Sequence, residues 1–459
     1  MKRSTKPATV FVAVLSFIIS ASFVIFQIKE DKSRNRGISS TNLVDQAGDY
    51  FLIVSDIHLD VDSTDVKYHH DTGMSLWDKT VEKLDSVVNQ TNGPDFVLYL
   101  GDLPAHKNWG NPRPPGSHER DLDSVLTGFR QLMDKASHVP FIYLPGNNDA
   151  IWGDYCEFSD PPQELPPFSL DQGFSQMWPA INVPKQSQSQ GPPYLINDTH
   201  RDKGYYSLYP LKNKDLRVIA LNTVIFSVND CDDSHHPWQH RKTDADEMLR
   251  FLDNELDSAA AHNEKVIIAM HIPPGLDTYC RSNCTATTPT TMWDNTIKYN
   301  RKTIQERFLE TLAEPTHQQA VVGVFTSHTH MDEIRLLSYH GDTIGVAISA
   351  PGISPNHGQN PGFKKVYYEK GSTYELTDFR TLYTTLDDVQ DKGRWGNRSY
   401  TFRDSYQCAT SCNATTIMDC IRCKNSNQLY DGMTQTFGVK MPGIICCDLR
   451  PMMLVTENQ

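Results

Sequence analysis

The sequence predicts an α/β fold, in which helices pack on a β-sheet, and three observations indicate it. Short apolar runs recur along the chain, and amphipathic segments of helical length lie between them. Of the 459 residues 38% are hydrophobic and 22% are charged, which provides enough apolar side chains for a packed core. The alternation of the two kinds of segment is typical of a sheet covered by helices.

The elements follow in order from these runs. Seven short apolar runs are interpreted as strands: residues 50–55, 96–100, 141–144, 216–221, 266–270, 321–326 and 344–348. Four amphipathic segments are interpreted as helices: residues 76–88, 121–135, 243–261 and 303–313. The Pro/Gln/Ser-rich stretches at 160–167 and 184–193 are expected to be surface loops.

The N-terminus predicts export. Basic residues Lys2, Arg3 and Lys6 precede a stretch without charges at 8–28, which approaches the roughly 20 residues that cross a bilayer. We interpret residues 1–28 as a signal-anchor that places the rest of the chain outside the membrane, with a cleaved signal peptide as the alternative. Residues 29–48 are then a mostly polar linker.

The charge balance excludes one class of protein. The chain has 43 basic and 56 acidic residues and a formal charge of −13, and it has no dense Lys/Arg stripe. A nucleic-acid scaffold is therefore not expected. A small anionic substrate is still compatible with this charge if metal ions hold it.

The cysteines also indicate an oxidising compartment. There are ten, and six of them fall in the last 52 residues, so residues 390–459 are predicted to be a small Cys-rich region stapled by disulfides. A zinc site formed by Cys408, Cys412, Cys420 and Cys423 is the alternative. Five sequons would permit glycosylation in a eukaryotic host: Asn89, Asn197, Asn283, Asn397 and Asn413.

Metal-binding residue types follow five of the predicted strands. They are two aspartates, one asparagine and four histidines: Asp56, His58, Asp102, Asn147, His271, His328 and His330. In open α/β sheets, ligands bind beyond the carboxyl ends of the strands. A carboxylate can bridge two divalent cations, and imidazoles complete the shells of zinc, manganese or iron. Two such ions, about 3.5–4 Å apart, can clamp a phosphoryl group and activate a water.

These motifs resemble the calcineurin-like metallophosphoesterase superfamily, whose pattern is D-x-H, G-D, G-N-H-[DE], H and G-H-x-H. The segments GDLPAH at 101–106, HIPPG at 271–275 and HTHMD at 328–332 are most similar to the acid sphingomyelinase-like phosphodiesterases. The resemblance covers residues 51–450 and includes the Cys-rich tail. It implies a four-layer α-β-β-α sandwich, with residues 49–389 as the catalytic domain.

The resemblance also implies roles. The first metal ion would be held by Asp56, His58 and His330, and the second by Asn147, His271 and His328, with Asp102 bridging the two. Family members typically bind two zinc ions, and a hydroxide between the ions attacks phosphorus. Zinc is therefore the expected metal, with manganese or iron as alternatives.

Two positions depart from the family pattern. Ser327 replaces the glycine before His-x-His, which is a change between small residues. Asn148 stands where the superfamily usually has a histidine that protonates the leaving group. An amide can hydrogen-bond a phosphate oxygen but cannot donate a full proton, so the general acid must come from elsewhere. His106 is the candidate, as in the sphingomyelinase-like family, and an exposed loop histidine is the alternative.

Other histidines and aromatic residues near the motifs could line a substrate rim or could simply be solvated or packed. They are His69, His70, His235, His236, His240, Trp109, Trp152, Tyr155 and Trp293.

The functional prediction is a membrane-anchored or secreted two-metal phosphodiesterase. Its substrates would be nucleotide-type or of the phospholipid and sphingomyelin type. Sphingomyelinases of this family have an N-terminal saposin-like domain that this sequence does not show, which favours soluble phosphoesters. The alternatives are an endopolyphosphatase-like phosphoanhydride hydrolase, because Asn-Asn-Asp at 147–149 is similar to vacuolar endopolyphosphatases, and a non-catalytic metal-binding protein of the same fold.

Overall fold

The computed structural model describes residues 48–106, 114, 116–136, 138–150, 153–157, 192–235, 238–278, 290–371, 373–441 and 448–459, and Gly48–Gln459 form one compact unit. The predicted signal-anchor, its linker up to residue 47 and the two Pro-rich loops up to residue 191 lie outside the described residues. Among the residues that are described, no helix has both the length and the apolar character needed to cross a membrane.

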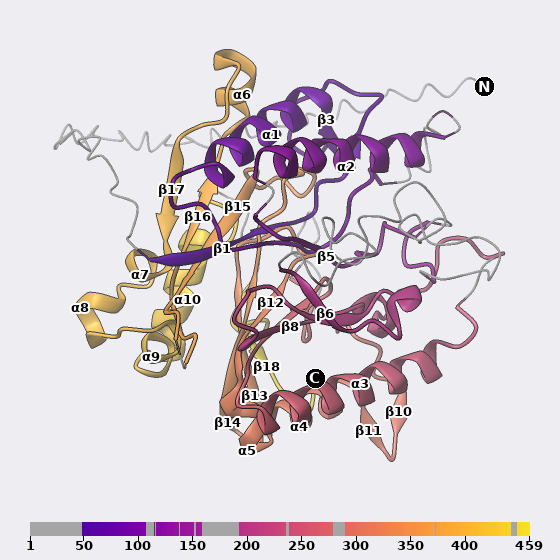
Figure 1. Cartoon of the computed structure of the whole chain (residues 1–459), viewed down its shortest axis with the longest axis vertical. Helices are drawn as coiled ribbons and strands as arrows, with labels where there is room; N and C mark the ends of the chain where they lie inside the picture. The colour runs from indigo at the N-terminus through magenta and orange to yellow at the C-terminus, as the bar shows by residue number, and fades with distance from the viewer. Residues whose placement is uncertain are drawn as a thin grey trace, which may run out of the picture. The chain divides into compact units, whose positions relative to one another are not determined.

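The unit contains two large β-sheets (Figure 1). The first has six strands in the order β17 (Arg398–Thr401), β16 (Leu376–Tyr383), β15 (Gly362–Tyr368), β1 (Asp49–Val54), β4 (Val97–Tyr99) and β5 (Phe141–Tyr143). Strands β1, β4 and β5 are parallel, and β15, β16 and β17 extend the sheet in antiparallel pairs.

The second sheet has eight strands. Their order is β18 (Leu454–Val455), β13 (Ile334–Tyr339), β14 (Asp342–Ser349), β12 (Val321–Thr326), β9 (Lys265–Met270), β8 (Leu216–Leu221), β7 (Tyr206–Tyr209) and β6 (Tyr194–Asn197). Strands β14, β12, β9 and β8 are parallel. Two short pairs lie outside these sheets: β2 (Leu59–Asp60) with β3 (Thr72–Gly73), and β10 (Lys298–Tyr299) with β11 (Lys302–Thr303).

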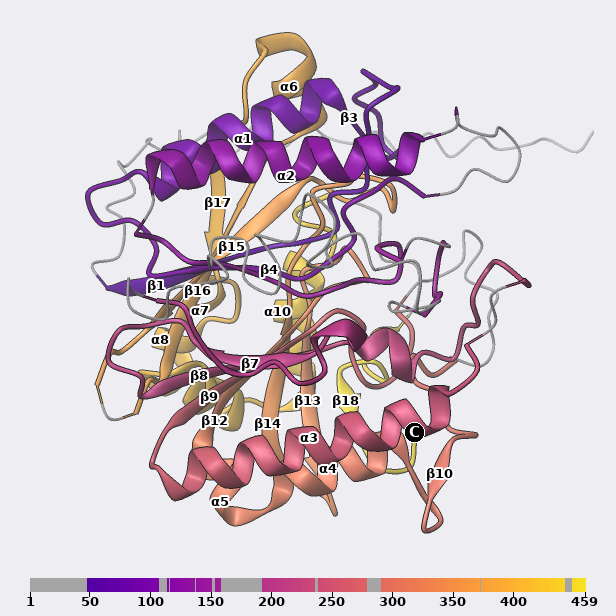
Figure 2. The ribbon, with the colours of Figure 1, turned by 45° about the vertical axis from the view of Figure 1, so that its right-hand side comes forward.

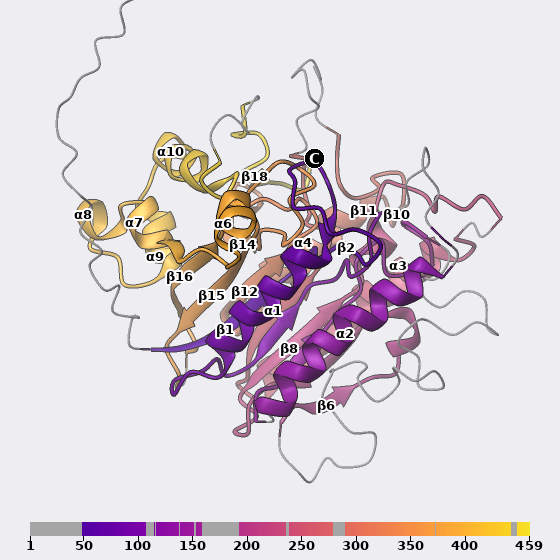
Figure 3. The same ribbon diagram turned by 90° about the horizontal axis from the view of Figure 1, so that it is seen from above.

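Helices cover the outer face of each sheet, which completes four layers (Figures 1 and 2). On the first sheet lie α1 (Met74–Val88) and α2 (Ser117–Lys135), which run side by side (Figure 3). On the second sheet lie α3 (Arg241–Ala261), α4 (Ile304–Ala313) and α5 (Pro315–Ala320). Two short 3-10 helices lie beside the second sheet: η1 (Arg201–Lys203) connects β6 to β7, and η2 (Thr223–Phe226) lies between β8 and α3.

Aromatic contacts hold the layers together. The rings of Phe51 on β1 and Phe325 on β12 meet edge to face at 5.2 Å between the two sheets. On the outer side, Phe129 of α2 contacts Tyr99 of β4 at 5.2 Å and Trp77 of α1 at 6.0 Å. All five rings are buried, as expected for strands covered on both faces. The predicted α-β-β-α sandwich is therefore confirmed.

The last 70 residues pack against this sandwich. They contribute α7 (Phe402–Ser405), α8 (Cys408–Cys412), α9 (Ile417–Arg422) and α10 (Ser426–Thr436), which lie beside β16 at one edge of the first sheet (Figure 3), while α6 (Leu386–Lys392) precedes them. Buried Phe402, Leu429 and Met433 join the same hydrophobic cluster as β1 and β4. The boundary at 389/390 between a catalytic domain and a Cys-rich region stays a prediction.

The described cysteines form three disulfides: Cys156–Cys231, Cys408–Cys420 and Cys412–Cys423. Cys408, Cys412, Cys420 and Cys423 thus pair with one another, which replaces the alternative of a zinc site and agrees with the predicted stapled tail. Cys280, Cys284, Cys446 and Cys447 lie outside the described residues.

Candidate metal centre

The seven predicted ligands come together where the parallel strands of the two sheets end. Asp56 and His58 follow β1, Asp102 follows β4 and Asn147 follows β5, all from the first sheet. His271 follows β9, and His328 and His330 follow β12, all from the second sheet. All seven side chains are buried.

The backbone at this edge is strained. Five of the seven residues have positive φ although none is glycine: Asp56 (48°), His58 (44°), Asp102 (62°), His328 (70°) and His330 (61°). Such conformations cost about 1–3 kcal/mol each and persist only where surrounding contacts hold them, which is common at functional sites.

Two glycines allow the loops after β4 and β5 to approach each other. A Cβ on Gly146 would lie 2.2 Å from Oδ1 of Asp102, and a Cβ on Gly101 would lie 2.2 Å from the backbone nitrogen of Gly146. Any side chain at either position would push the two loops apart. This close approach explains why a glycine precedes both Asp102 and Asn147.

The first cluster consists of Asp56, His58 and His330. The Nε2 atoms of His58 and His330 lie 3.1 Å apart, and Nε2 of His330 lies 3.7 Å from Oδ1 of Asp56. Oδ1 of Asp56 accepts a hydrogen bond from the backbone of His328, but its buried Oδ2 atom has no hydrogen-bond partner among the described residues. A buried carboxylate oxygen without a donor is costly unless a cation balances it.

The second cluster consists of Asp102, His271 and His328, with Asn147 beside them. Oδ1 of Asn147 lies 2.9 Å from Nε2 of His271. Oδ2 of Asp102 lies 3.2 Å from Nε2 of His271 and 3.3 Å from Nε2 of His58. One carboxylate oxygen therefore lies between the imidazoles of the two clusters.

Backbone carbonyls orient three of the imidazoles. Nδ1 lies within hydrogen-bond distance of a carbonyl oxygen in His58 (Pro104, 3.2 Å), His271 (Leu100, 2.6 Å) and His330 (Ser354, 3.2 Å). A proton on Nδ1 leaves Nε2 with a free lone pair, which is the usual arrangement around a metal ion. Two of these lone pairs then face each other across 3.1 Å, and a shared cation would stabilise that contact.

Burial shifts the pKa values of several of these ligand candidates. Burial raises the pKa of Asp56 to about 7, whereas burial lowers the pKa values of His58, His328 and His330. Although burial disfavours charge at Asp102 too, the nearby His271 and His58 hold its pKa well below the usual range.

His106 lies next to the first cluster and not in open solvent. Its ring stacks on that of His58, with centroids 4.0 Å apart and an interplanar angle of 14°. Asp71 holds it at two points, because its Oδ1 lies 2.8 Å from Nδ1 and its Oδ2 accepts from the backbone nitrogen of His106 at 2.9 Å. Burial disfavours the imidazolium, but the Asp71 carboxylate outweighs this effect and raises the pKa of His106 to about 9.

The two departures from the family pattern also have defined contacts. Asn148 donates its backbone N–H to Oδ1 of Asp102 at 2.8 Å and its side-chain Nδ2 to Oδ2 at 3.1 Å. Ser327 Oγ donates to the carbonyl of Leu100 at 3.1 Å and lies 2.9 Å from Nδ1 of His271. A hydroxyl at 327 thus fits the site and links the two sheets.

Two further carboxylates support the site, and the first of them, Asp149, occupies the last position of the G-N-H-[DE] pattern. Asp149 accepts backbone N–H groups from Asp102, Leu103 and Gly146 at 2.7–2.9 Å, which ties the two loops together. Asp71 is the other. It follows the predicted His69-His70 pair directly, but nothing in the sequence indicates its contact with His106, 35 residues away.

The remaining predicted residues divide between packing and surface. Trp293 is part of the core, where it contacts Phe226 and Phe308. Tyr155 is half-buried, with its hydroxyl 3.5 Å from Nε2 of His328. His235 is exposed and His240 precedes α3, which agrees with a solvated loop. The exposed His70 and its neighbour His69 lie on the loop that leads to Asp71, where His69 donates its backbone N–H to the carbonyl of Pro355. Three further residues lie outside the described part of the chain: Trp109, Trp152 and His236.

Fold and site together define a class of protein: an α/β sandwich with two clusters of residues that could hold metal ions, and with the Asp102 carboxylate between them. The model of the calcineurin-like phosphoesterase family matches residues 50–332, and the chain belongs to that family.

Curated relatives agree with this class. The chain is 28% identical over 323 residues to "Sphingomyelin phosphodiesterase" of Bos taurus, which covers 69% of this chain and 44% of the relative. It is 29% identical over 340 residues to "Cyclic GMP-AMP phosphodiesterase SMPDL3A" of Rattus norvegicus, covering 71% of this chain and 65% of the relative. "Sphingomyelin phosphodiesterase 1" of Caenorhabditis elegans is 23% identical over 336 residues, covering 71% and 51%. The matched part is thus less than two thirds of each relative's length.

Proposed function

We propose that this protein is a metal-dependent phosphodiesterase. The observation that carries the proposal is the position of Asp102, whose Oδ2 lies 3.2–3.3 Å from one imidazole of each ligand cluster. A shared carboxylate between two groups of buried ligands is the arrangement that holds two divalent cations.

The residues present fit such a pair of ions. Asp56, His58 and His330 would hold the first, and Asn147, His271 and His328 the second, with Asp102 between them. Cations would stabilise both the Oδ2 atom of Asp56, which has no hydrogen-bond partner among the described residues, and the facing Nε2 atoms of His58 and His330. Imidazole and carboxylate ligands favour zinc, with manganese or iron as alternatives. When bound, two such ions supply Lewis acidity to the phosphoryl group and lower the pKa of a coordinated water.

His106 is the proposed proton donor to the leaving group. Asp71 fixes its Nδ1 side, so Nε2 is the atom that can give a proton to a substrate above the first cluster. The side chain is 31% exposed, which leaves the ring accessible from the site. A pKa of about 9 keeps the imidazole protonated at neutral pH, as a general acid requires.

Asn148 is the second proposed catalytic residue. Its amide already donates to Asp102, and it lies at the same loop as Asn147. In the proposed role it is a hydrogen-bond donor near the substrate phosphate, and it does not supply a proton.

The proposed substrate class is a phosphodiester. The names of the relatives place sphingomyelin and cyclic GMP-AMP among the substrates of similar proteins, and both contain that bond. Nucleotide-type and sphingomyelin-type diesters are therefore the two natural substrates to compare, and inorganic polyphosphate is the phosphoanhydride alternative.

The disulfides support the predicted compartment. Three described pairs fit an oxidising environment, as in secreted or otherwise exported proteins. The signal-anchor at residues 1–28 stays a prediction, and so does glycosylation, although Asn89, Asn397 and Asn413 are exposed and accessible.

A hydrolysis assay tests the proposal. The full chain, purified without chelator, would be compared on bis(p-nitrophenyl) phosphate, p-nitrophenyl phosphate and polyphosphate, before and after chelation. We expect diester cleavage that chelation abolishes and that Asp102→Asn reduces at least 100-fold. Preferred cleavage of polyphosphate would support the phosphoanhydride alternative, and no cleavage of any substrate by the metal-loaded chain would contradict an enzymatic role.

A further inference from the structure

Asp154, a carboxylate outside the seven ligands, contacts the side chain of one of them directly. Asp154 accepts a hydrogen bond from Nδ2 of Asn147 through its Oδ1, at 2.6 Å. The other end of the same amide, Oδ1 of Asn147, lies 2.9 Å from Nε2 of His271, within the second cluster. Asn147 is buried, so its amide has few other partners to choose from.

The orientation of this amide decides whether Asn147 can bind a cation. An asparagine side chain has an oxygen that can coordinate a metal and an NH2 group that repels it, and the two ends have nearly the same shape. A carboxylate can only accept hydrogen bonds, so Asp154 selects the orientation in which the NH2 group faces away from the cluster. The carboxylate therefore favours the orientation in which the oxygen of Asn147 faces His271.

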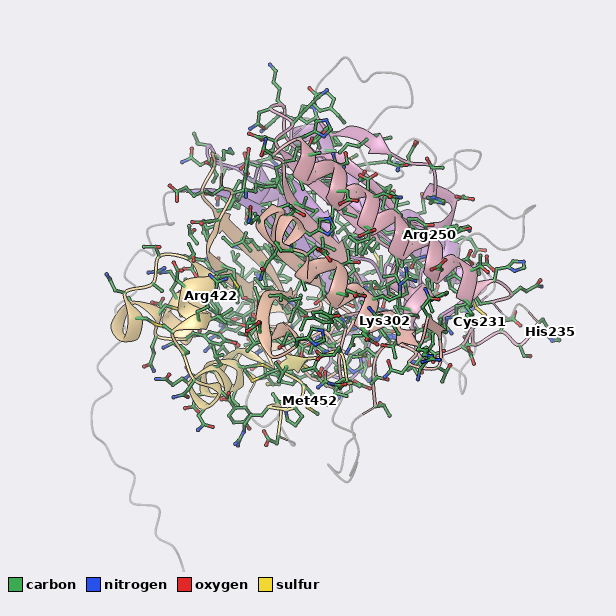
Figure 4. The ribbon with its side chains drawn as sticks, turned by 90° about the horizontal axis from the view of Figure 1, so that it is seen from below. Cys231, His235, Arg250, Lys302, Arg422 and Met452 are labelled. Atoms are coloured by element: carbon green, nitrogen blue, oxygen red, sulfur yellow. A yellow bond between two sulfur atoms is a disulfide. The ribbon has the colours of Figure 1, made fainter. Side chains whose placement is uncertain are left out.

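The segment that carries Asp154 is fixed at several points. Tyr155 donates its backbone N–H to the carbonyl of Asn147 at 2.9 Å, and Asp232 donates its own to the carbonyl of Asp154 at 3.0 Å. The Cys156–Cys231 disulfide joins the same two loops. Cys231 lies in the loop that leads into α3, at the surface (Figure 4).

We propose that Asp154 is a positioning residue for the second metal site, which it serves by fixing the amide of Asn147, and that the Cys156–Cys231 disulfide keeps Asp154 in place. This inference rests on the proposed two-metal function, but it concerns contacts that neither the family pattern nor the ligand set contains. Outer partners of metal ligands are typically worth 10–100-fold in metal affinity.

Zinc titration of the chelator-treated full chain, in competition with a chromophoric chelator, measures this contribution without any substrate. We expect two ions per wild-type chain. In Asp154→Ala one of the two ions should lose 10–100-fold in affinity while the other is unchanged. Asp154→Asn should lose less, because its amide oxygen still accepts from Asn147. Circular dichroism of the metal-free proteins checks that each variant is folded.

A second pair of variants gives a result that a purely structural role would not produce. In the Asn147→Asp background, the carboxylate of Asp154 faces another carboxylate and the hydrogen bond is lost. Asp154→Asn should then tighten the second ion, because the new amide donates to the carboxylate at 147. The same substitution weakens that ion in the wild type, so its effect changes sign. An effect of the same sign in both backgrounds would overturn the proposal.

The disulfide is tested against a matched control. Removing Cys156–Cys231 with two alanines should weaken the second ion at least several-fold. Removing Cys412–Cys423 in the same way should not, because that disulfide belongs to the C-terminal helices, where Arg422 lies far from Cys231 across the view in Figure 4. Equal effects of the two removals would overturn the role of the disulfide.

The titration also separates this inference from the proposed function. One ion per wild-type chain would overturn both. Two ions in the wild type, with unchanged affinities in Asp154→Ala, would overturn this inference alone and leave the two-metal site intact.

Discussion

Replacing Lys364 by methionine is expected to destabilise the protein by about 3–5 kcal/mol, because it leaves a buried carboxylate without its cation. Lys364 lies on β15 and its Nζ is 2.6 Å from Oδ1 of Asp332, two residues after the metal-ligand candidate His330. The side chains are 0% and 1% exposed. Screening by water is therefore small, and the pair falls outside the range of weak surface ion pairs.

The size of this loss in stability follows from the contacts that Asp332 keeps without Lys364. Without Lys364, Asp332 still accepts from Thr381 at 2.5 Å and from Tyr400 at 2.7 Å, so its charge is partly solvated by hydroxyl groups. Asp332 therefore loses one buried charge partner, and the methionine side chain fills most of the volume of the lysine stem. Adding Asp332→Asn removes the uncompensated charge and keeps an acceptor for both hydroxyls. The double variant is therefore expected to regain at least about 1 kcal/mol relative to Lys364→Met.

Urea unfolding followed by circular dichroism at pH 7 measures these changes. Lys79→Met is the matched control, because Lys79 pairs at 2.7 Å with Glu82, which is 63% exposed, and such a pair is worth less than about 1 kcal/mol. A loss below 1 kcal/mol for Lys364→Met, or a double variant less stable than Lys364→Met, would refute the reasoning.

Three further predictions concern single side chains. His106→Ala should lower kcat about 10²–10⁴-fold on a diester with an alkoxide leaving group, but much less on bis(p-nitrophenyl) phosphate, whose leaving group needs no proton. Equal losses on the two substrates would exclude His106 as the general acid. Asp71→Asn should move the alkaline fall of kcat/KM to lower pH, because Asp71 raises the pKa of His106 to about 9. pH–rate profiles of the two proteins at equal metal content measure this shift, and an alkaline fall at unchanged pH would contradict the prediction. Burial raises the pKa of Asp378 to about 6, so the folded state binds a proton that the unfolded state has released, and the wild type loses at most about 3 kcal/mol of stability as pH rises from about 4 to 6. Asp378→Asn should remove this loss. Stability profiles of the two proteins that run parallel with pH would contradict the prediction.

The sequence predicted the parallel strands well because they are almost purely apolar. β8 and β12 have the predicted bounds, 216–221 and 321–326, and the five ligand-bearing strand ends were recognised from short apolar runs followed by polar residues. Antiparallel strands such as β15 were not recognised. β15 contains Lys364 and Lys365, both buried, and only the fold shows that one of them neutralises Asp332.

The site residues also divide into those that local sequence motifs indicate and those that only the fold reveals. Residue types and their order pointed to the seven ligand candidates, since each motif is local in the sequence. Asp71 and Asp154 were not singled out, because a lone aspartate in a loop has no signature and its partner is defined only by folding. The positive φ angles at Asp56 and His58 accompany hydrogen bonds to another loop, from their backbone nitrogens to the carbonyls of Gly101 and Asp102, and these contacts too are defined only by folding.

The central claim is that two metal ions share Asp102. Crystals of the metal-loaded full chain, with diffraction data collected on both sides of the zinc absorption edge, test it most directly. The account predicts two anomalous peaks about 3.5–4 Å apart, one on each side of Oδ2 of Asp102. A single peak, or two peaks that Asp102 does not join, would contradict it.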